Sequence, residues 1–343
     1  MSKVLITGGT GFIGSHVVRA FCDKGTDVRC LVRKGSNLLN IEGLPVELVY
    51  GEIEDLHSFK AALDDVEYVV HIAALAKDWG TYESFYKTNV EGTLNLLRAC
   101  VDKNINDIII TASVSVYGEE NCQDIKSESS PHNSHYPYFA DKCFPCAMNY
   151  YRDTKTEAKE KAIEYAKRNG LNLTVIEPVW VYGEREFSSG FYEYLKTVRD
   201  GVPFLPGTRK NKYHVVYAAD LAKAYVLVFK KRLQGVNCYI IGNDKAEFMD
   251  DIYGLFCAKA ELRKPLRLPK YMVYPIGFLL EFLYTIFGSK IPPVLTRGRV
   301  NMFYDNIEYS TKKAKEELGF ACDYSLDEGI SRTVKWYKEK NLL

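Results

Sequence analysis

A tyrosine and a lysine four residues apart, Tyr151 and Lys155, carry the clearest chemistry in the sequence. On a helix this spacing places both side chains on one face. A free phenol titrates near about pH 10, too high for a base at neutral pH, but a neighbouring ammonium group stabilises the phenolate and lowers its pKa. Ser113, at the end of an expected strand, is placed to hydrogen-bond the substrate oxygen that exchanges the proton. We therefore predict a catalytic set of Ser113, Tyr151 and Lys155.

A glycine-rich turn near the start of the chain predicts a dinucleotide phosphate site. Gly8, Gly11 and Gly14 lie in a glycine-rich run, Thr7–Gly14, that contains the pattern GxGxxG directly after a short apolar strand and before an amphipathic run. The first two can take positive φ and allow close approach of a pyrophosphate, and the third lets the helix pack against the strand. Phe12 and Ile13, at the helix start, are expected to present free N–H groups and partial positive charge to the phosphates.

The end of the second expected strand, residues 27–33, bears on which cofactor is bound. It falls about 20 residues beyond the glycine turn, where the adenine ribose lies in this kind of fold. An acid there binds the ribose 2′-OH of NAD, whereas Arg33 suits the 2′-phosphate of NADP, and Lys34 adds positive charge. We expect NADP(H), with NAD(H) as the alternative if both bases are only solvated.

Short apolar strands alternate with helical patterns along most of the chain, which indicates a parallel sheet with right-handed crossovers. The predicted fold class is α/β, a Rossmann-type doubly wound parallel sheet with a smaller, mostly helical C-terminal substrate lobe. We expect the dinucleotide-binding domain over residues 1–182, with 212–242 returning to it. Residues 183–211 and 243–343 are expected to form the substrate lobe.

The composition is that of an ordinary globular enzyme. The 343 residues have a net charge of +1 and are 47% hydrophobic, so nucleic acid is not an expected partner. No basic region followed by an apolar core is visible at the N-terminus, and nine cysteines then suggest free thiols in a reducing cytoplasm. We expect a cytoplasmic protein.

Residues 119–149 form a long connection, and loops of that length are more often functional than idle. Cys143 and Cys146 within it have the spacing of a metal or redox pair. The neighbouring cysteine and histidine gaps match no common metal module. We therefore expect free thiols and no metal site.

Residues 271–288 are dominated by apolar and aromatic side chains, close to a minimal membrane span. Glu281 lies in the middle, Pro275 and Gly277 interrupt the run, and lysines bracket it. We expect an amphipathic helix that lines an apolar pocket, with peripheral membrane contact as the alternative.

Taken together, the motifs resemble those of an extended short-chain dehydrogenase/reductase of the NAD-dependent epimerase/dehydratase family over nearly the full length. The matching segments are Thr7–Gly14, Gly51–Ile53, His71–Ala74, Asn89–Thr93, Ser113–Gly118, Tyr151–Lys155 and Pro178–Gly183. By this resemblance Ser113, Tyr151 and Lys155 are the catalytic triad, and the family often forms homodimers through two helices. The cofactor-binding residues that it implies, beyond the glycine turn, Arg33 and Lys155, are Glu52 and Ile53 beside the adenine, Ala73, Ala74, Asn89, and Pro178 on the nicotinamide side.

Within the family, several positions separate the possible reactions. Dehydratases carry an Asp-Glu pair after the catalytic hydroxyl residue, where this chain has Val114 and Ser115. Nucleotide-sugar epimerases usually carry an arginine for the substrate diphosphate where Tyr213 stands here. Lys212, Arg297 and Arg299 are the bases that could compensate.

The apolar segment and the Pro292–Arg297 run after it are similar to members that resemble 3β-hydroxysteroid dehydrogenase or dihydroflavonol reductase. The first hypothesis is thus an NAD(P)-dependent oxidoreductase that interconverts a secondary alcohol and a ketone on a fairly apolar small molecule. The second is a nucleotide-sugar epimerase with tightly held NAD. The third is a non-catalytic dinucleotide-binding protein, against which the intact triad argues.

Overall fold

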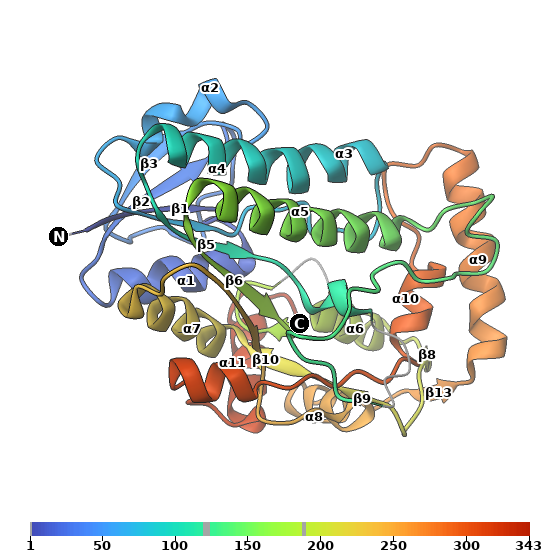
Figure 1. The fold of residues 1–343 in the computed structure, drawn as a ribbon. Helices are drawn as coiled ribbons and strands as arrows, with labels where there is room; N and C mark the ends of the chain where they lie inside the picture. The colour runs from blue at the N-terminus through green and yellow to red at the C-terminus, as the bar shows by residue number, and fades with distance from the viewer. Residues whose placement is uncertain (1, 119–123, 187–189) are drawn as a thin grey trace.

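A seven-stranded parallel sheet forms the centre of the protein (Figure 1). The structure, a computed structural model, describes residues 2–118, 124–186 and 190–343. The sheet order is β11-β6-β5-β4-β1-β2-β3. The strands are β1 Lys3–Thr7, β2 Asp27–Val32, β3 Val46–Tyr50, β4 Tyr68–His71, β5 Asp107–Thr111, β6 Asn172–Pro178 and β11 Val236–Ile241. This confirms the predicted doubly wound α/β class.

Helices cover both faces of the sheet, which is why its strands are nearly continuous apolar runs. In β1, Val4 and Ile6 belong to one core cluster and Leu5 to the other, as the alternation of a strand requires. Figure 1 shows α1 and α7 on one face and α4 and α5 on the other. Their bounds are α1 Phe12–Cys22, α7 Ala218–Lys231, α4 Gly92–Asp102 and α5 Ala147–Asn169.

The strand order reverses between β1 and β4, which are neighbours in the sheet although β2 and β3 lie between them in the chain. Thr7 pairs with His71 at the carboxyl ends of these strands. In open α/β sheets a crevice for ligands forms at such a point. The glycine turn after β1 and the loop after β4 therefore meet at the expected cofactor site.

The C-terminal part is mostly helical and lies at the carboxyl end of the sheet (Figure 1). Residues 212–242 return to the sheet, because α7 packs on α1 and β11 pairs with β6. The domain boundaries given above remain a prediction. The remaining elements are α2 Leu56–Phe59, α3 Tyr82–Tyr86, α6 Gly190–Arg199, α8 Met249–Lys259, α9 Lys270–Ile286, α10 Arg297–Met302 and α11 Leu326–Glu339, with the paired short strands β7 Trp180–Tyr182 and β10 Val215–Tyr217, β8 Phe204–Pro206 and β13 Leu266–Leu268, and β9 Lys212–Tyr213 and β12 Glu247–Phe248.

The apolar segment is a helix, α9 Lys270–Ile286, as expected, and the apolar pocket that we expected beside it stays a prediction. Only Val273, Gly277 and Glu281 are buried, one stripe along the helix, and most of its other side chains are exposed. These three residues are spaced by four, so they lie on one side of the helix, and this is the side that packs against the protein. None of the helices in the described ranges is long and apolar enough to cross a membrane.

A buried ion pair holds α9 in place. The Arg297 guanidinium donates to both carboxylate oxygens of Glu281, at 2.9 and 2.8 Å, and the Arg297 backbone N–H donates to the same carboxylate at 2.8 Å. Its remaining donors reach the carbonyl oxygens of Phe139, at 2.5 Å, and Phe144, at 2.8 Å. Arg297 therefore joins α9, the start of α10 and the loop before α5.

We expect Glu281→Ala to lower the free energy of unfolding by about 3 to 5 kcal/mol, because it leaves the Arg297 charge buried without its partner. Urea unfolding measures the change. Glu328→Ala, which removes an exposed pair with Arg332 on α11, is the control and should cost no more than about 0.5 kcal/mol. Equal costs for the two variants would contradict the structural role of the buried pair.

Candidate active site

The glycine turn has no room for side chains at Gly8 and Gly14. Gly8 has a φ of +73°, and a Cβ there would lie 2.6 Å from the backbone nitrogen of Ala73. A Cβ on Gly14 would lie 2.0 Å from the carbonyl oxygen of Gly8. Gly11 differs from our expectation of positive φ, since its φ is −76° as the residue before α1. Its backbone N–H closes the turn by donating to the Gly8 carbonyl at 3.0 Å.

The start of α1 faces this turn without a side-chain cap. The backbone N–H groups of the first helical turn, which begins with Phe12 and Ile13, have no acceptor within the helix itself. Such a helix end attracts anions through these donors and through the helix dipole. The cradle therefore fits a dinucleotide pyrophosphate, and Ala73, whose backbone touches Gly8, forms its opposite wall.

On the expected adenosine side, Arg33 directly follows β2 and is exposed, as is Lys34. Neither forms an ion pair with an acid in the ranges that the structure describes. Glu52 is exposed, while Ile53 is buried under α4, where a Cβ on Gly92 would lie 2.9 Å from the Ile53 side chain. Two free cations thus stand beside the strand end at which a 2′-phosphate is expected.

His71, at the end of β4, is a structural residue. Its Nδ1 lies 2.7 Å from the Thr7 hydroxyl, and its Nε2 lies 3.0 Å from the hydroxyl of Thr93. Thr93 donates its own proton to the Asn89 carbonyl, so the Nε2–H of His71 donates to Thr93 and the Nδ1 accepts from Thr7. Burial lowers the pKa of His71 to about 3, which keeps the ring neutral.

Asn89 connects the loop after β4 to α5. It lies in a π-helical turn, Lys87–Glu91, of the kind often found at functional sites. The Asn89 side-chain oxygen accepts from the backbone of Leu75 at 2.8 Å, and its amide donates to Thr154 at 3.1 Å. The structure thus occupies Asn89 in positioning the residue next to Lys155. Nothing in the sequence indicates this role of Thr154, apart from its place within the Tyr151–Lys155 motif.

Ser113 lies just beyond β5 and caps a short 3-10 helix, Val114–Tyr117. Its hydroxyl oxygen accepts from the backbone of Ser115 at 3.2 Å, which fixes the side chain at the crevice. Ala73, Ala74 and the glycine turn lie at the ends of the neighbouring strands β4 and β1. Sheet order therefore places Ser113 on the cofactor side of the protein.

Tyr151 and Lys155 lie one turn apart on α5, and the partly exposed tyrosine precedes the buried lysine. The Lys155 ammonium donates to the carbonyl oxygen of Thr111 at 2.5 Å. This bond ties α5 to the strand that carries Ser113. The structure thus brings Lys155 to the end of β5, two residues before Ser113 in the chain, and the shared catalytic site of Ser113, Tyr151 and Lys155 stays a prediction.

Burial lowers the pKa of Lys155 from its ordinary 10.5 to about 8. The ammonium is therefore still protonated at neutral pH, but its charge is poorly solvated and interacts strongly with nearby groups. A cation held in this way is suited to stabilising a phenolate one helical turn away.

A second buried ion pair, which sequence reasoning missed, fixes the next turn of α5. Lys159 lies 2.7 Å from Glu177, and their side chains are 3% and 0% exposed. The Tyr117 hydroxyl donates to Glu177 at 2.7 Å and lies 3.0 Å from the Lys159 nitrogen. Because Glu177 precedes Pro178 at the end of β6, the pair fixes α5 against β6, the strand whose end we expect beside the nicotinamide. The only signal is that Lys159 follows Lys155 by four residues.

The three bases expected to replace an epimerase arginine all have partners. Lys212 pairs with Glu308 at 2.7 Å, and Arg299 pairs with Asp78. Arg297 is fully buried with its acid, as described above. Tyr213 is only 2% exposed. None of these four residues presents a free cation to a substrate diphosphate.

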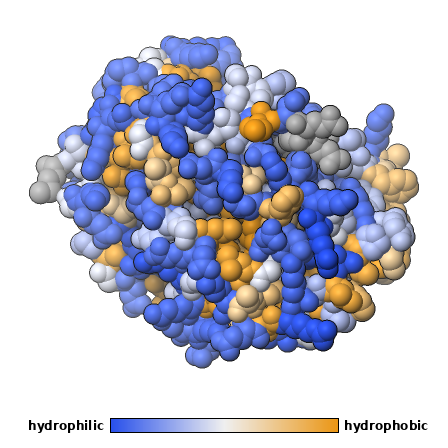
Figure 2. Space-filling model, turned by 90° about the horizontal axis from the view of Figure 1, so that it is seen from below, coloured by the Kyte–Doolittle hydropathy of each residue, from blue (hydrophilic) through white to orange (hydrophobic). Residues whose placement is uncertain are grey.

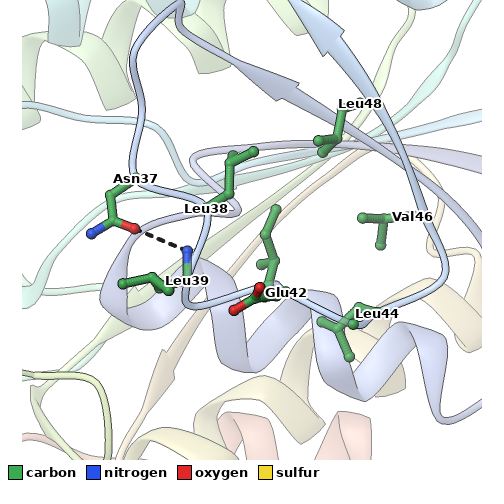
Figure 3. A pocket seen from close by; sticks show the side chains of 9 residues that line it. Asn37, Leu38, Leu39, Glu42, Leu44, Val46 and Leu48 are labelled. Carbon is green, nitrogen blue, oxygen red and sulfur yellow. Dashed lines mark hydrogen bonds between the residues drawn. The ribbon is translucent and has the colours of Figure 1, made fainter.

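A pocket of about 380 Å³ is lined by residues 37–39 and 41–44, from the connection between β2 and β3, and by Val46 and Leu48 of β3. Figure 3 shows these side chains. The walls of the pocket are apolar side chains such as Leu38, Leu44 and Leu48, which point toward its centre. Asn40, from the same connection, donates to the carbonyl oxygen of Thr10 in the glycine turn at 3.0 Å. The pocket contains none of the catalytic residues and does not identify a substrate.

Cys143 is exposed and Cys146 is buried, and both are free thiols. Burial raises the pKa of Cys146 to about 12, so it is protonated at neutral pH. Across the described part of the chain, no group of three or more histidine, cysteine, aspartate or glutamate side chains is arranged to hold a metal ion.

The model of the NAD dependent epimerase/dehydratase family matches residues 4–242, which is most of the chain. The chain belongs to this family. Its members use a nicotinamide dinucleotide, so such a cofactor is what the glycine cradle accommodates. The match ends after β11 and thus covers every strand of the central sheet.

Two curated relatives align along nearly the whole chain. A 2-alkyl-3-oxoalkanoate reductase of Shewanella oneidensis is 24% identical over 97% of this chain and 85% of its own length. A 3beta-hydroxysteroid-dehydrogenase/decarboxylase of Arabidopsis thaliana is 26% identical over 96% of this chain, which spans 61% of that protein. Among solved structures, a UDP-glucose 4-epimerase of Thermotoga maritima superposes with a TM-score of 0.77 at 22% identity over 99% of both chains, which shows a shared fold.

We expect Lys155→Met to be more stable than the wild type at neutral pH, by about 1 to 3 kcal/mol, because it removes a buried charge but also a hydrogen bond. The pKa of Lys155 is lowered by folding, so the unfolded chain binds more protons between about pH 8 and 10.5. Wild-type stability therefore rises with pH through that window, and the advantage of the variant shrinks. Urea unfolding at both ends of the window measures this.

Lys167→Met, at an exposed position near the end of α5, is the matched control. Its effect on the free energy of unfolding should stay within about 0.5 kcal/mol at every pH. A Lys155→Met advantage that does not change with pH would rule out the lowered pKa as its cause.

Proposed function

We propose that this protein is an NADP(H)-preferring oxidoreductase that interconverts a secondary alcohol and a ketone on a fairly apolar small molecule. The observation that carries the proposal is the placement of the Lys155 ammonium. It is buried one helical turn from Tyr151 and donates to the carbonyl oxygen of Thr111, the last residue of β5. Ser113 follows Thr111 by two residues. This arrangement provides a proton donor, a group that lowers its pKa, and a hydroxyl for the substrate oxygen.

In the direction of reduction, Tyr151 donates its phenolic proton to the carbonyl oxygen of the substrate. Lys155 stabilises the phenolate that remains and also reaches the ribose next to the nicotinamide. The Ser113 hydroxyl donates to the same substrate oxygen and holds it in line with Tyr151. The cofactor, when bound, supplies the hydride to the carbonyl carbon and accepts it in the reverse reaction.

The cofactor would lie along the crevice from the glycine turn to β6. Gly8, Gly11 and Gly14 with the N–H groups of Phe12 and Ile13 would hold the pyrophosphate. Arg33 would bind the 2′-phosphate, because its own side chain and that of Lys34 are exposed and no acid among the described residues forms an ion pair with it. The remaining contacts that we propose come from Glu52, Ile53, Ala73, Ala74, Lys155 and Pro178.

The apolar substrate is supported by the names of the two curated relatives and by the occupied bases of the substrate side. A nucleotide-sugar epimerase, the alternative, needs a cation for the substrate diphosphate, and Lys212, Arg297 and Arg299 are each held by an acid. The substrate would be enclosed by the C-terminal lobe and the loop before α5. The homodimer remains a proposal, with α4 and α5 as its contact helices.

Cofactor binding tests the proposal directly. We expect purified protein to release no stoichiometric nucleotide on denaturation, and the cofactor-free protein to bind NADPH at least about tenfold more tightly than NADH, since Arg33 adds a charge-assisted bond to the 2′-phosphate. Arg33→Ala should weaken NADPH binding to the level of NADH and leave NADH binding unchanged, by titration calorimetry. Arg263→Ala, at an exposed position in the C-terminal lobe, is the matched control. One tightly held NAD per chain would instead favour the epimerase.

A further inference from the structure

The outer face of α9 and the segment after it form the largest group of exposed apolar side chains on the described part of the protein. Of twenty exposed large hydrophobic residues, eleven lie between 271 and 294. This α9 patch consists of Tyr271, Met272, Ile276, Leu279, Phe282, Leu283, Tyr284, Ile286, Phe287, Ile291 and Val294. Figure 1 shows α9 at one edge of the molecule, and Figure 2 shows apolar residues along that edge. Patches of this extent on a folded protein mark a binding surface.

The charges around the patch are almost all positive. From Leu262 to Tyr304 the chain has a single acid, Glu281, which is buried against Arg297. Arg263 and Lys290 are exposed and have no acid partner among the described residues. The segment has four further bases that are paired with acids: Lys264 and Arg267 with Asp250, Arg297 with Glu281, and Arg299 with Asp78. The bases without an acid partner among the described residues, Arg263, Lys270 and Lys290, are the charges of this segment that are complementary to an anionic surface.

The shape of the patch favours a lipid bilayer over a folded protein as its partner. Residues 282–286 at the end of α9 and the capping Phe287 are all exposed, although Phe282 also packs against Phe144 at 5.5 Å between ring centres. Successive residues of a helix differ by about 100° in direction, so these side chains are spread around the axis. A second copy of the chain would present a firm surface and cover one side of the helix. A lipid bilayer surrounds a protruding apolar helix end on all sides, while the lysines that bracket it remain at the headgroups.

The patch is continuous with the segment that leads to Tyr151. Phe139, itself 64% exposed, packs edge-on against Phe278 of α9 at 5.2 Å between ring centres. Arg297 binds the carbonyl oxygen of Phe139 and the acid of α9 together. The next residue, Gly298, touches Met148, one turn before Tyr151 on α5.

We propose that the α9 patch docks on the surface of an anionic phospholipid bilayer. This part of the proposal rests on the proposed function: an apolar ketone or alcohol dissolved in that bilayer would reach Tyr151 along the seam between α9 and the loop before α5. Because no described helix is long enough to cross a bilayer, α9 lies in the interface rather than through it.

Co-sedimentation with vesicles tests the docking without cofactor or substrate. The wild type should bind vesicles of phosphatidylcholine mixed with phosphatidylglycerol more tightly than vesicles of phosphatidylcholine alone. The double variant Ile286→Asp with Phe287→Glu should lose at least about tenfold in affinity for the mixed vesicles, since it puts charge where apolar surface would be buried. Phe248→Glu, at a 45% exposed phenylalanine of β12, is the matched control and should bind as the wild type does.

Lys290→Glu should weaken binding to the anionic vesicles, and Lys340→Glu, near the C-terminus, should not. The same variants should keep the wild-type unfolding midpoint and NADPH affinity, so a failure of the docking proposal is distinguishable from a failure of the proposed function. Double-variant protein that sediments like the wild type would overturn the proposal. So would absence of vesicle binding together with a wild-type dimer that the double variant dissociates in light scattering, which would assign the face to a second copy.

Discussion

The burial of one ammonium group, that of Lys155, is the constraint on which the rest of the site depends. A desolvated charge is costly, and here it is compensated by the carbonyl oxygen of Thr111 at 2.5 Å. The helix that carries it is therefore fixed at several points. Asn89 holds the preceding residue, Thr154, and the Lys159–Glu177 pair holds the following turn against β6. Tyr151 lies on the same helix, which these contacts hold in place.

The glycine turn is likewise fixed by a few close contacts. Gly8 and Gly14 bring the β1 turn, the start of α1 and the loop after β4 within contact distances that a single methyl group would prevent. Sheet order places this junction next to the strand that bears Ser113. One parallel sheet therefore positions both the cofactor cradle and the predicted catalytic residues, because its strand order reverses between β1 and β4.

The sheet, its helices and the residues at the strand ends could be predicted from the sequence, because they follow local rules. Apolar runs indicate buried strands, GxGxxG indicates a turn that allows close approach, and the i, i+4 spacing of Tyr151 and Lys155 puts them on one face. Lys159–Glu177 and Glu281–Arg297 could not be found in this way, because each joins residues whose proximity depends on the tertiary fold. The buried side of α9 could not be predicted for the same reason, since an apolar helix has no periodicity that tells which stripe faces the protein.

Transfer of deuterium from NADPH labelled at C4 of its nicotinamide tests the central claim most directly. The substrates would be apolar ketones, 2-alkyl-3-oxoalkanoates among them, with UDP-sugars offered in parallel. The account predicts deuterium on the new carbinol carbon, one NADP⁺ formed per alcohol, and a loss of about a hundredfold or more in Tyr151→Phe, where the proton donor is missing. Epimerisation of a UDP-sugar without net oxidation of the cofactor, and no label in any alcohol, would contradict it.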